Sequence, residues 1–254
     1  MAAIITGADS GIGRATAVAL ARRGHDVAIT YSRDADGANA TAEEVRSDDR
    51  RAEVRHLDLS QSADVQPVID ELAGALGGVD VLVNNAGTGA DTPFLELELD
   101  KWRDVLAIDL TGALLTAQAA ARRMVADGTR GRIVNVTSVH EHVPLHGATP
   151  YVVAKHGLGG LTKMMALELA EHGITVNSVA PGEIATPTTG QEDEDPRRAQ
   201  RPGVPAGRPG DAREVAELIA YLTSPQAGYT TGASYVVDGG MLLMAAQANI
   251  IATS

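Results

Sequence analysis

The stretch ITGADSGIGRA, residues 5–15, places three glycines directly after the apolar run AAII and directly before the segment ATAVALARRG. The apolar run is typical of a buried strand, and the apolar spacing after the glycines is typical of a helix. A glycine-rich turn between a strand and a helix lets the backbone approach a pyrophosphate, and the helix N-terminus supplies amide donors. We therefore predict a dinucleotide site at the start of this chain.

The three glycines have separate expected roles in this turn. Gly7 permits the tight turn, Gly11 removes a side chain where the backbone meets the pyrophosphate, and Gly13 lets the helix pack close to the sheet. The spacing is T-G-x-x-x-G-x-G rather than G-x-G-x-x-G. The predicted cofactor-binding residues of the turn are Gly7, Asp9, Ser10, Gly11, Ile12 and Gly13.

Short apolar runs alternate with helical patterns along the rest of the chain. The predicted strands are 2–6, 26–31, 52–57, 79–84, 132–137, 174–179 and 233–237, and the predicted helices are 13–23, 35–47, 61–76, 100–127, 151–171 and 211–223. This alternation predicts βαβ units and an α/β fold. We expect a single Rossmann-type domain over residues 1–254, with a doubly wound parallel sheet of about seven strands and helices on both faces.

Composition narrows the classes of function. The 254 residues include 21 Lys and Arg against 33 Asp and Glu, so the net charge is −12, which disfavours binding to nucleic acid or to an anionic membrane. The chain has no cysteine, which excludes disulfides, thiol nucleophiles and zinc–thiolate sites. No signal peptide pattern and no apolar run of about 18 residues is present, so we expect a soluble cytoplasmic protein.

The end of the second predicted strand indicates which dinucleotide is bound. An acidic residue there would bind the ribose 2′-hydroxyl of NAD, but this strand ends in Tyr31, Ser32 and Arg33. A hydroxyl and a guanidinium suit a 2′-phosphate, which favours NADP over NAD. The neighbouring Asp34 is a complication, because its carboxylate could neutralise Arg33.

A tyrosine and a lysine lie four residues apart in YVVAK, residues 151–155. On a helix Tyr151 and Lys155 share one face, and an ammonium beside a tyrosine stabilises its phenolate form. The pair could therefore donate or accept a proton at neutral pH. Ser138 ends the strand RIVNVTS, at the sheet edge where ligands bind in such folds, and could hydrogen-bond a substrate oxygen.

With these parts in order, the chain resembles the short-chain dehydrogenase/reductase family. The resemblance rests on TGADSGIG (6–13), HLDLS (56–60), NNAG (84–87), Ser138, YVVAK (151–155), VNSVAPGEIATP (176–187) and YTTGASYVVDGG (229–240), which cover nearly the whole chain. It implies that Tyr151 is the general acid in reduction, that Lys155 supports it and binds the nicotinamide ribose, and that Ser138 positions the substrate. It also implies cofactor contacts from Asp58, Leu59, Asn84, Asn85, Ala86, Gly87, Pro181, Gly182, Ile184 and Thr186.

One position departs from the family pattern. The helix after Trp102 normally carries an asparagine whose backbone carbonyl holds a water leading to the lysine, and the matching residue here is Asp109. Its carbonyl could still hold that water. A carboxylate near Lys155 would instead favour the ammonium form and offset part of its attraction for the phenolate. We therefore count Asp109 among the catalytic residues and expect a shifted pH profile.

The resemblance leaves the substrate open. SVHE (138–141) and the C-terminal GGM resemble the glucose 1-dehydrogenase branch, and His140, Glu141 and His142 could bind a sugar or a small ketone. The alternative branch is 3-oxoacyl-carrier-protein reductase, against which the net charge argues, although Arg197, Arg198, Arg201 and Arg208 could form a basic patch. A non-catalytic dinucleotide-sensing regulator is a further alternative, disfavoured because Ser138, Tyr151 and Lys155 are all present. The histidines at 140, 142 and 146 lack a completing carboxylate, so we expect no metal.

Two further segments have sequence features that predict a loop or lid and a subunit contact. Residues 183–210 are rich in Pro, Gly and charge, which predicts either a solvated loop or a lid over the substrate. The C-terminal stretch from residue 229 is unusually apolar, and the family resemblance implies that it packs across subunits. We therefore expect a homotetramer.

Overall fold

The computed structural model describes residues 1–89, 91–191 and 195–244. Seven parallel strands form one sheet in the order β3-β2-β1-β4-β5-β6-β9. Their bounds are β1 Ala2–Ile5, β2 Asp26–Tyr31, β3 Ala52–His56, β4 Val81–Asn84, β5 Arg132–Val136, β6 Thr175–Pro181 and β9 Ser234–Val237. The predicted α/β fold class is confirmed. The strand order reverses between β1 and β4, and a crevice for ligands is expected outside the carboxyl ends of strands at such a point.

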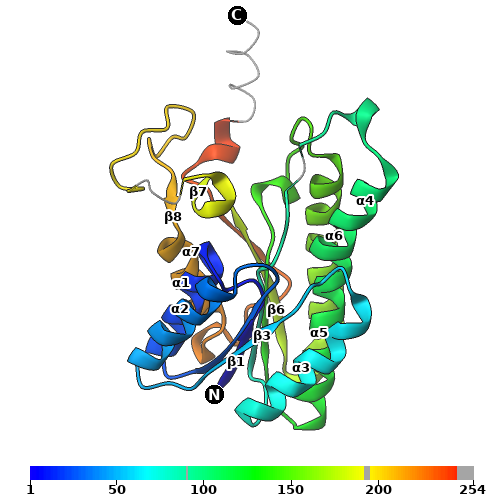
Figure 1. The fold of residues 1–254 in the computed structure, drawn as a ribbon, viewed down its shortest axis with the longest axis vertical. Coiled ribbons are helices and arrows are strands. Elements are labelled where there is room, and N and C mark those ends of the chain that lie inside the picture. Colours follow the sequence, from blue (N-terminus) through cyan, green and yellow to red (C-terminus); the bar gives the residue numbers. More distant parts are fainter. Residues whose placement is uncertain (90, 192–194, 245–254) are drawn as a thin grey trace, which may run out of the picture.

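Helices cover both faces of the sheet, as Figure 1 shows. One face carries α1 Gly11–Arg22, α2 Ala35–Ser47 and α7 Ala212–Leu222, and the other carries α3 Ser62–Leu76, α5 Ala113–Ala126 and α6 Thr149–Leu169. Each helix has its own apolar face, because a helix with apolar residues three and four apart buries that stripe against the sheet. Both faces of the strands are therefore buried, which explains their continuous apolar sequences.

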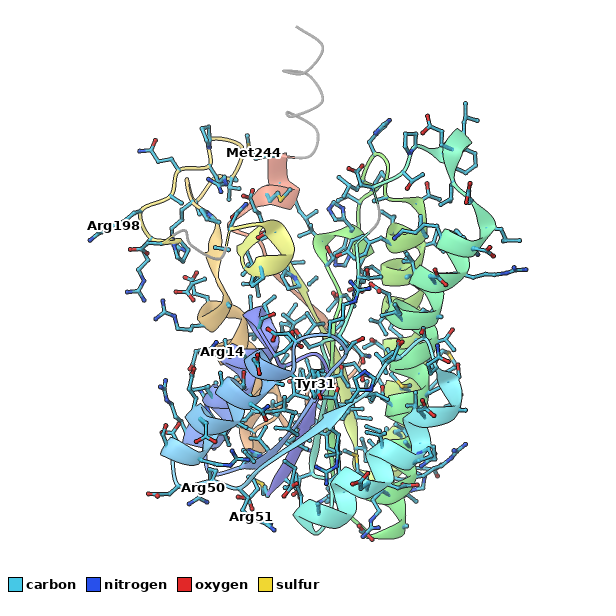
Figure 2. The ribbon with its side chains drawn as sticks, viewed as in Figure 1. Arg14, Tyr31, Arg50, Arg51, Arg198 and Met244 are labelled. Carbon is cyan, nitrogen blue, oxygen red and sulfur yellow. The ribbon has the colours of Figure 1, made fainter. Side chains whose placement is uncertain are left out.

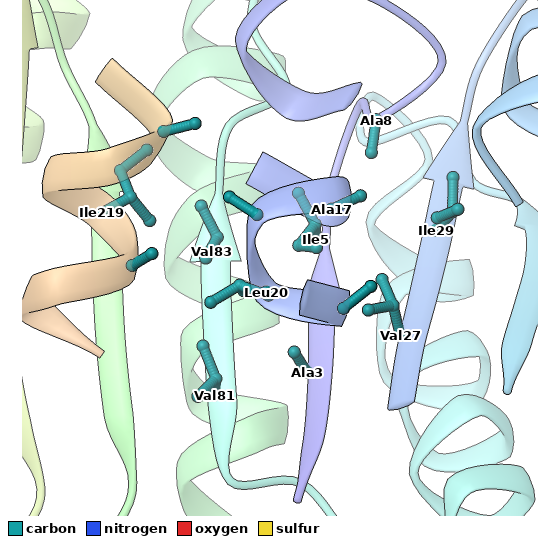
Figure 3. Packing of buried hydrophobic residues seen from close by; sticks show 14 of the residues in the cluster. Ala3, Ile5, Ala8, Ala17, Leu20, Val27, Ile29, Val81, Val83 and Ile219 are labelled. Carbon is teal, nitrogen blue, oxygen red and sulfur yellow. The ribbon is translucent and has the colours of Figure 1, made fainter. Parts of the chain in front are cut away.

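Each face has its own hydrophobic core. Figure 3 shows the core beneath α1 and α7, where Leu20 and Ile219 pack toward Ile5, Val83 and Val27 of the sheet. Leu20, Ile219 and Ile5 are fully buried, and burying one such side chain contributes about 1.5–3 kcal/mol. The second core lies beneath α3, α5 and α6 and is built in the same way from Leu, Ile, Val and Ala. The cores hold the strand ends, and thus the crevice, in a fixed arrangement.

The predicted helix 100–127 contains an irregularity that periodicity does not reveal. It consists of α4 Leu99–Leu106, a π-helical turn η2 Ala107–Gly112, and α5. Such turns insert one residue into a helix and often occur at functional sites. By length and composition the continuous run Leu99–Ala126 could cross a membrane, but half of its most apolar window is buried in this domain, as in a core helix.

Short elements connect the main ones. A second sheet pairs β7 Ile184–Ala185 with β8 Gly210–Asp211, and it joins the two ends of the predicted lid. The single-turn helices are η1 Phe94–Glu96, η3 Val139–Glu141, η4 Ala170–His172, η5 Pro187–Thr189, η6 Pro225–Ala227 and η7 Met241–Met244. Of these, η3 and η5 follow directly after residues predicted to form the site.

Candidate active site

The glycine turn between β1 and α1 has the strained, close-packed geometry that its sequence predicts. Gly7 and Gly11 have φ angles of +61° and +53°, a region that side chains rarely adopt. A Cβ on Gly7 would lie 2.9 Å from the Cα of Ala86, and one on Gly13 would lie 2.3 Å from the carbonyl oxygen of Gly7. The Asn85 amide donates to that same oxygen at 2.7 Å. The turn is therefore fixed against the end of β4, with α1 beginning at the crevice, a geometry that fits a pyrophosphate.

A cleft of about 470 Å³ runs across the carboxyl ends of the central strands. The predicted residues that line it are Gly7, Asp9, Ser10, Gly11, Ile12, Tyr31, Ser32, Arg33, Asp58, Leu59, Asn85, Ala86, Gly87, Ser138, Tyr151, Lys155, Pro181, Gly182, Ile184 and Thr186. Residues that the sequence did not single out also line it: Leu57, Thr88, Gly89, Ile108, Val136, Thr137 and Thr189. Several of these directly follow or precede predicted motif residues, so extending each motif by one or two positions would have found them.

Asn84 does not take the cofactor position predicted for it. Its side chain is buried, and its amide donates to the carbonyl of Ala113 and to Oδ1 of Asn135, both at 3.0 Å. Its own Oδ1 accepts a hydrogen bond from the Thr116 hydroxyl at 2.6 Å. Because both polar atoms of the Asn84 side chain are used to join β4 to β5 and α5, the side chain supports the cleft from behind. Gly13 likewise packs behind the turn and does not line the cleft.

The far end of the cleft is formed by the loop after β2. Figure 2 shows Tyr31 near the middle of the molecule, at the carboxyl end of this strand. Arg33 is exposed and lines the cleft. Asp34 is the N-cap of α2, and its Oδ1 accepts a hydrogen bond from the Gly37 N–H at 2.8 Å. No ion pair joins Asp34 to Arg33 within the described residues, so the neutralisation that the sequence left open does not occur in this structure.

The opposite end of the cleft brings the predicted catalytic residues together. Ser138 lies two residues after the end of β5, and Tyr151 and Lys155 lie in the first turns of α6. The Lys155 Nζ lies 5.5 Å from the centre of the Tyr151 ring and donates to the carbonyl of Val136 at 3.4 Å. The lysine is buried while all three side chains reach the cleft. An ammonium beside a tyrosine is an arrangement that can support proton transfer.

Asp109 lies in the π-helical turn, directly behind Lys155. Its Oδ2 is 3.3 Å from Nζ, and its Oδ1 accepts a hydrogen bond from the Thr88 N–H at 2.7 Å. Burial, the largest single effect, lowers the pKa of Lys155, but the Asp109 carboxylate and Tyr151 together outweigh it, so the pKa of the lysine is raised. Burial also raises the pKa of Asp109, against the opposing effect of the ammonium. The structure thus places a carboxylate, rather than a neutral amide, against the ammonium.

The three residues predicted to bind a polar substrate lie elsewhere. The His140 ring packs edge-on against the Tyr151 ring, with 6.2 Å between centroids, and its Nδ1 lies 3.2 Å from the carbonyl of Val143. The Glu141 side chain is buried among hydroxyls, and Nε2 of His142 lies 3.2 Å from Oγ of Ser234. None of the three belongs to the described lining of the cleft. The reason is that η3 turns the chain back onto β6 and β9 directly after Ser138.

The predicted lid borders the cleft at its beginning. Ile184, Thr186 and Thr189 line the cleft, and Nε of Arg201 donates to Oε1 of Glu183 at 2.5 Å, tying the loop to its own base. Figure 2 shows Arg198 at the outer edge of this loop. Residues 192–194 of the segment lie outside the described residues. A lid function for 183–210 stays a prediction.

Comparison with known proteins identifies close relatives. The family model described as enoyl-(acyl carrier protein) reductase matches residues 7–242. An uncharacterized oxidoreductase of Escherichia coli, YohF, is 50% identical over 97% of this chain and 98% of its own length. Glucose 1-dehydrogenase 2 of Bacillus subtilis is 35% identical over 96% of each chain. The crystal structure of acetoin dehydrogenase YohF from Salmonella typhimurium superposes with a TM-score of 0.91 at 50% identity, covering 95% of this chain and 96% of that one.

Proposed function

The chain belongs to the short-chain dehydrogenase/reductase family, and from that premise we propose that it is a cytoplasmic, NADP-dependent enzyme interconverting a small ketone and its secondary alcohol. The family and its relatives support a dinucleotide-dependent oxidoreductase acting on CH–OH groups. The presence of Ser138, Tyr151 and Lys155 favours this enzyme over a purely regulatory protein. The observation that carries the proposal is one cleft with the glycine turn at one end and Ser138, Tyr151 and Lys155 at the other.

The chain's own residues supply the acid–base part of this reaction. When bound, the nicotinamide donates or accepts the hydride. Ser138 holds the substrate oxygen by a hydrogen bond, and the Tyr151 hydroxyl gives its proton to that oxygen during reduction. Lys155 stabilises the phenolate that remains, because its ammonium lies beside the ring. In oxidation the same groups take the proton from the alcohol.

Two observations support a small ketone or hydroxyketone over a sugar. A sugar needs several polar groups in the pocket, and His140, Glu141 and His142, the candidates for this role, do not line the cleft. Solved relatives at 50% identity include an acetoin dehydrogenase, whose named substrate is a small hydroxyketone. We therefore propose acetoin and the corresponding diketone as the substrate pair.

The charges of the loop argue against the alternative, a 3-oxoacyl-carrier-protein reductase. An acidic carrier protein requires a basic docking surface. Three arginines of the predicted basic patch are paired with carboxylates: Arg198 with Asp195, Arg201 with Glu183 and Arg208 with Glu214. These three ion pairs neutralise most of the positive charge of the predicted basic patch. The chain as a whole also carries a net charge of −12, which would repel an acidic carrier protein.

The first experiment measures NADPH consumption by the purified protein with diacetyl, and NADPH formation from NADP⁺ with acetoin and with D-glucose. We expect turnover with the small carbonyls and none with glucose. Turnover with glucose at a comparable kcat/KM would restore the sugar as substrate. Turnover with an acyl thioester, but with neither small ketone nor glucose, would favour the acyl reductase.

The coenzyme preference gives a second prediction. Replacing Arg33 with alanine removes a charge-assisted contact to the 2′-phosphate, so we expect KM for NADPH to rise about 10- to 100-fold and KM for NADH to stay within about twofold. Arg14 is a suitable control, because its guanidinium is paired with Glu44 on α2 and does not line the cleft. An equal effect of Arg33→Ala on both coenzymes, or a wild-type enzyme that prefers NADH, would contradict the NADP assignment.

We also propose a homotetramer. Large apolar side chains are exposed along the outer surfaces of α4 and α6, including Leu99, Met164 and Leu167, the last of which is 74% exposed. Exposed apolar surface on adjacent helices favours association. The apolar C-terminal segment belongs to this expectation as well, but its residues 245–254 lie outside the described residues. Light scattering on the purified protein measures the assembly directly.

A further inference from the structure

Glu141 is a buried carboxylate whose hydrogen-bond partners are hydroxyl groups. Its Oε2 accepts from the Thr137 hydroxyl at 2.7 Å, from Ser234 at 3.1 Å and from Ser178 at 3.3 Å. Within the described part of the chain, no Lys, Arg or His forms an ion pair with it. Burying a carboxylate without a cation is costly, and hydrogen bonds offset only part of that cost. The cost of burying Glu141 suggests that its carboxylate has a role in the site.

The hydrogen bonds of Glu141 hold the turn that contains Ser138. Thr137, which directly precedes Ser138, is held by the Glu141 side chain, while the Glu141 backbone N–H donates to the carbonyl of Ser138 at 2.8 Å. Within the same turn, the Ser138 hydroxyl accepts from the His140 N–H at 3.2 Å. The carboxylate then reaches the neighbouring strand β6 through Ser178 and the edge strand β9 through Ser234. One side chain therefore fixes the turn of Ser138 to two strands, β6 and β9.

The same turn also contacts the helix that carries the tyrosine. A Cβ on Gly159 of α6 would lie only 2.3 Å from Oε1 of Glu141, so the carboxylate packs directly onto the helix backbone one turn beyond Lys155. Beside it, the His140 ring packs against the Tyr151 ring. The turn at Ser138 and the first turns of α6 are thus held relative to one another at two points.

We propose that Glu141 is a positioning residue that holds the Ser138 hydroxyl in a fixed geometry relative to Tyr151. The inference rests on the proposed carbonyl reduction. A carboxylate suits this position because one of its oxygens can accept several O–H donors at once. An apolar residue would remove this acceptor from Ser178 and Ser234 and leave Thr137 only the carbonyl of Val179. An amide keeps one acceptor oxygen, so glutamine preserves part of the network.

The test compares Glu141→Ala and Glu141→Gln with a control at Asn177. Asn177 is also buried, in β6. Its side chain joins this strand to the segment before β9, through the carbonyl of Thr230 and the N–H of Ala233, and forms no described hydrogen bond with the turn at Ser138. We expect Glu141→Ala to lower kcat for diacetyl about 100-fold with KM for NADPH within about twofold, since misplacing a reacting group by about 1 Å costs that much. Glu141→Gln should recover most of kcat, and Asn177→Ala should lower Tm while leaving kcat nearly unchanged.

A double-mutant cycle separates positioning from general stabilisation. If Glu141 acts through Ser138, then Glu141→Ala in a Ser138→Ala background should lower kcat no further. Additive losses, or a loss in Glu141→Ala no greater than in Asn177→Ala, would overturn the positioning role and leave the proposed function intact. If Glu141→Ala does not fold, Ser234→Ala replaces it, removing one donor to the carboxylate with an expected kcat loss of about threefold. A wild-type protein that reduces no carbonyl would overturn the proposed function, and this inference with it.

Discussion

Tyr151→Phe should lower kcat for diacetyl by at least about 10³-fold while KM for NADPH stays within about twofold. The phenolic hydroxyl is the group we assign as proton donor, and general acid catalysis contributes about 10²- to 10⁴-fold. Phenylalanine keeps the ring that packs against His140, so the fold of α6 and the position of Lys155 should be preserved. Steady-state kinetics and coenzyme fluorescence measure the two quantities separately.

Tyr229→Phe is the matched control for this substitution. Tyr229 is fully exposed and does not line the cleft, so the loss of its hydroxyl should change neither kcat nor Tm. If Tyr151→Phe retains kcat within about tenfold of the wild type, another group supplies the proton. A loss of coenzyme binding that matches the loss of kcat would mean that the hydroxyl acts in binding rather than in proton transfer.

The backbone of this site was predictable because two strong local signals coincide. Short apolar runs with Gly-rich or polar ends predict the strands, and the helical spacing of apolar residues between them predicts the connecting helices. As a result, β2 and α2 begin and end at the residues that the sequence predicts. The glycine turn adds a signal that does not depend on periodicity, because Gly7 and Gly11 occupy φ angles that other residues avoid. Both signals are local in the sequence, which is why they suffice.

The directions of polar side chains were less predictable. Asn84 and Glu141 both belong to motifs that border the cleft, but each side chain points into a buried network. Their partners, including Thr116 and Ser234, lie 32 and 93 residues away along the chain. Which face a polar group takes at the end of a strand depends on those distant partners, and no pattern within the motif records them.

The π-helical turn of η2 was also beyond sequence reasoning. The apolar residues of η2 keep nearly the same helical spacing as those of α4 and α5, because a single inserted residue shifts the periodicity only slightly. The sequence therefore predicts one helix over 100–127. Similarly, β7 and β8 have two residues each, which is too short for any alternation to be visible. The first of these irregularities matters for function, since it places Asp109 against Lys155.

Removing the charge of Asp109 should move the pH–rate profile of alcohol oxidation to lower pH by about one unit. Its carboxylate lies 3.3 Å from the Lys155 ammonium and offsets part of the positive charge that the Tyr151 phenolate experiences. In Asp109→Asn the ammonium charge acts fully on the phenolate character that develops at Tyr151 during oxidation, so oxidation should extend to lower pH. Removing a nearby unit charge, at an effective dielectric constant of about 20, has an effect of this order.

The upper limb of the same profile should move in the same direction. Burial lowers the pKa of Lys155, and the Asp109 carboxylate is the largest of the effects that raise it again. Without the carboxylate the pKa of the lysine falls, so the ammonium is lost at a lower pH than in the wild type. Profiles of kcat/KM for acetoin, measured with both proteins in the same buffers, test both limbs. A profile of Asp109→Asn that superposes on the wild type would show that the carboxylate does not act on Lys155.

Asp109→Leu separates the electrostatic role from the structural one. Removing one partner of a buried ion pair leaves the other charge uncompensated, at a cost of about 3–5 kcal/mol, so Tm should fall by roughly 10 °C. Asp109→Asn also leaves the ammonium without its counter-charge, but its amide oxygen can still accept the Thr88 N–H, so the loss of stability should be smaller. The double variant Asp109→Leu with Lys155→Met removes both charges and should regain most of the stability while staying inactive. If the single leucine variant is as stable as the wild type, the two side chains are not an ion pair in solution.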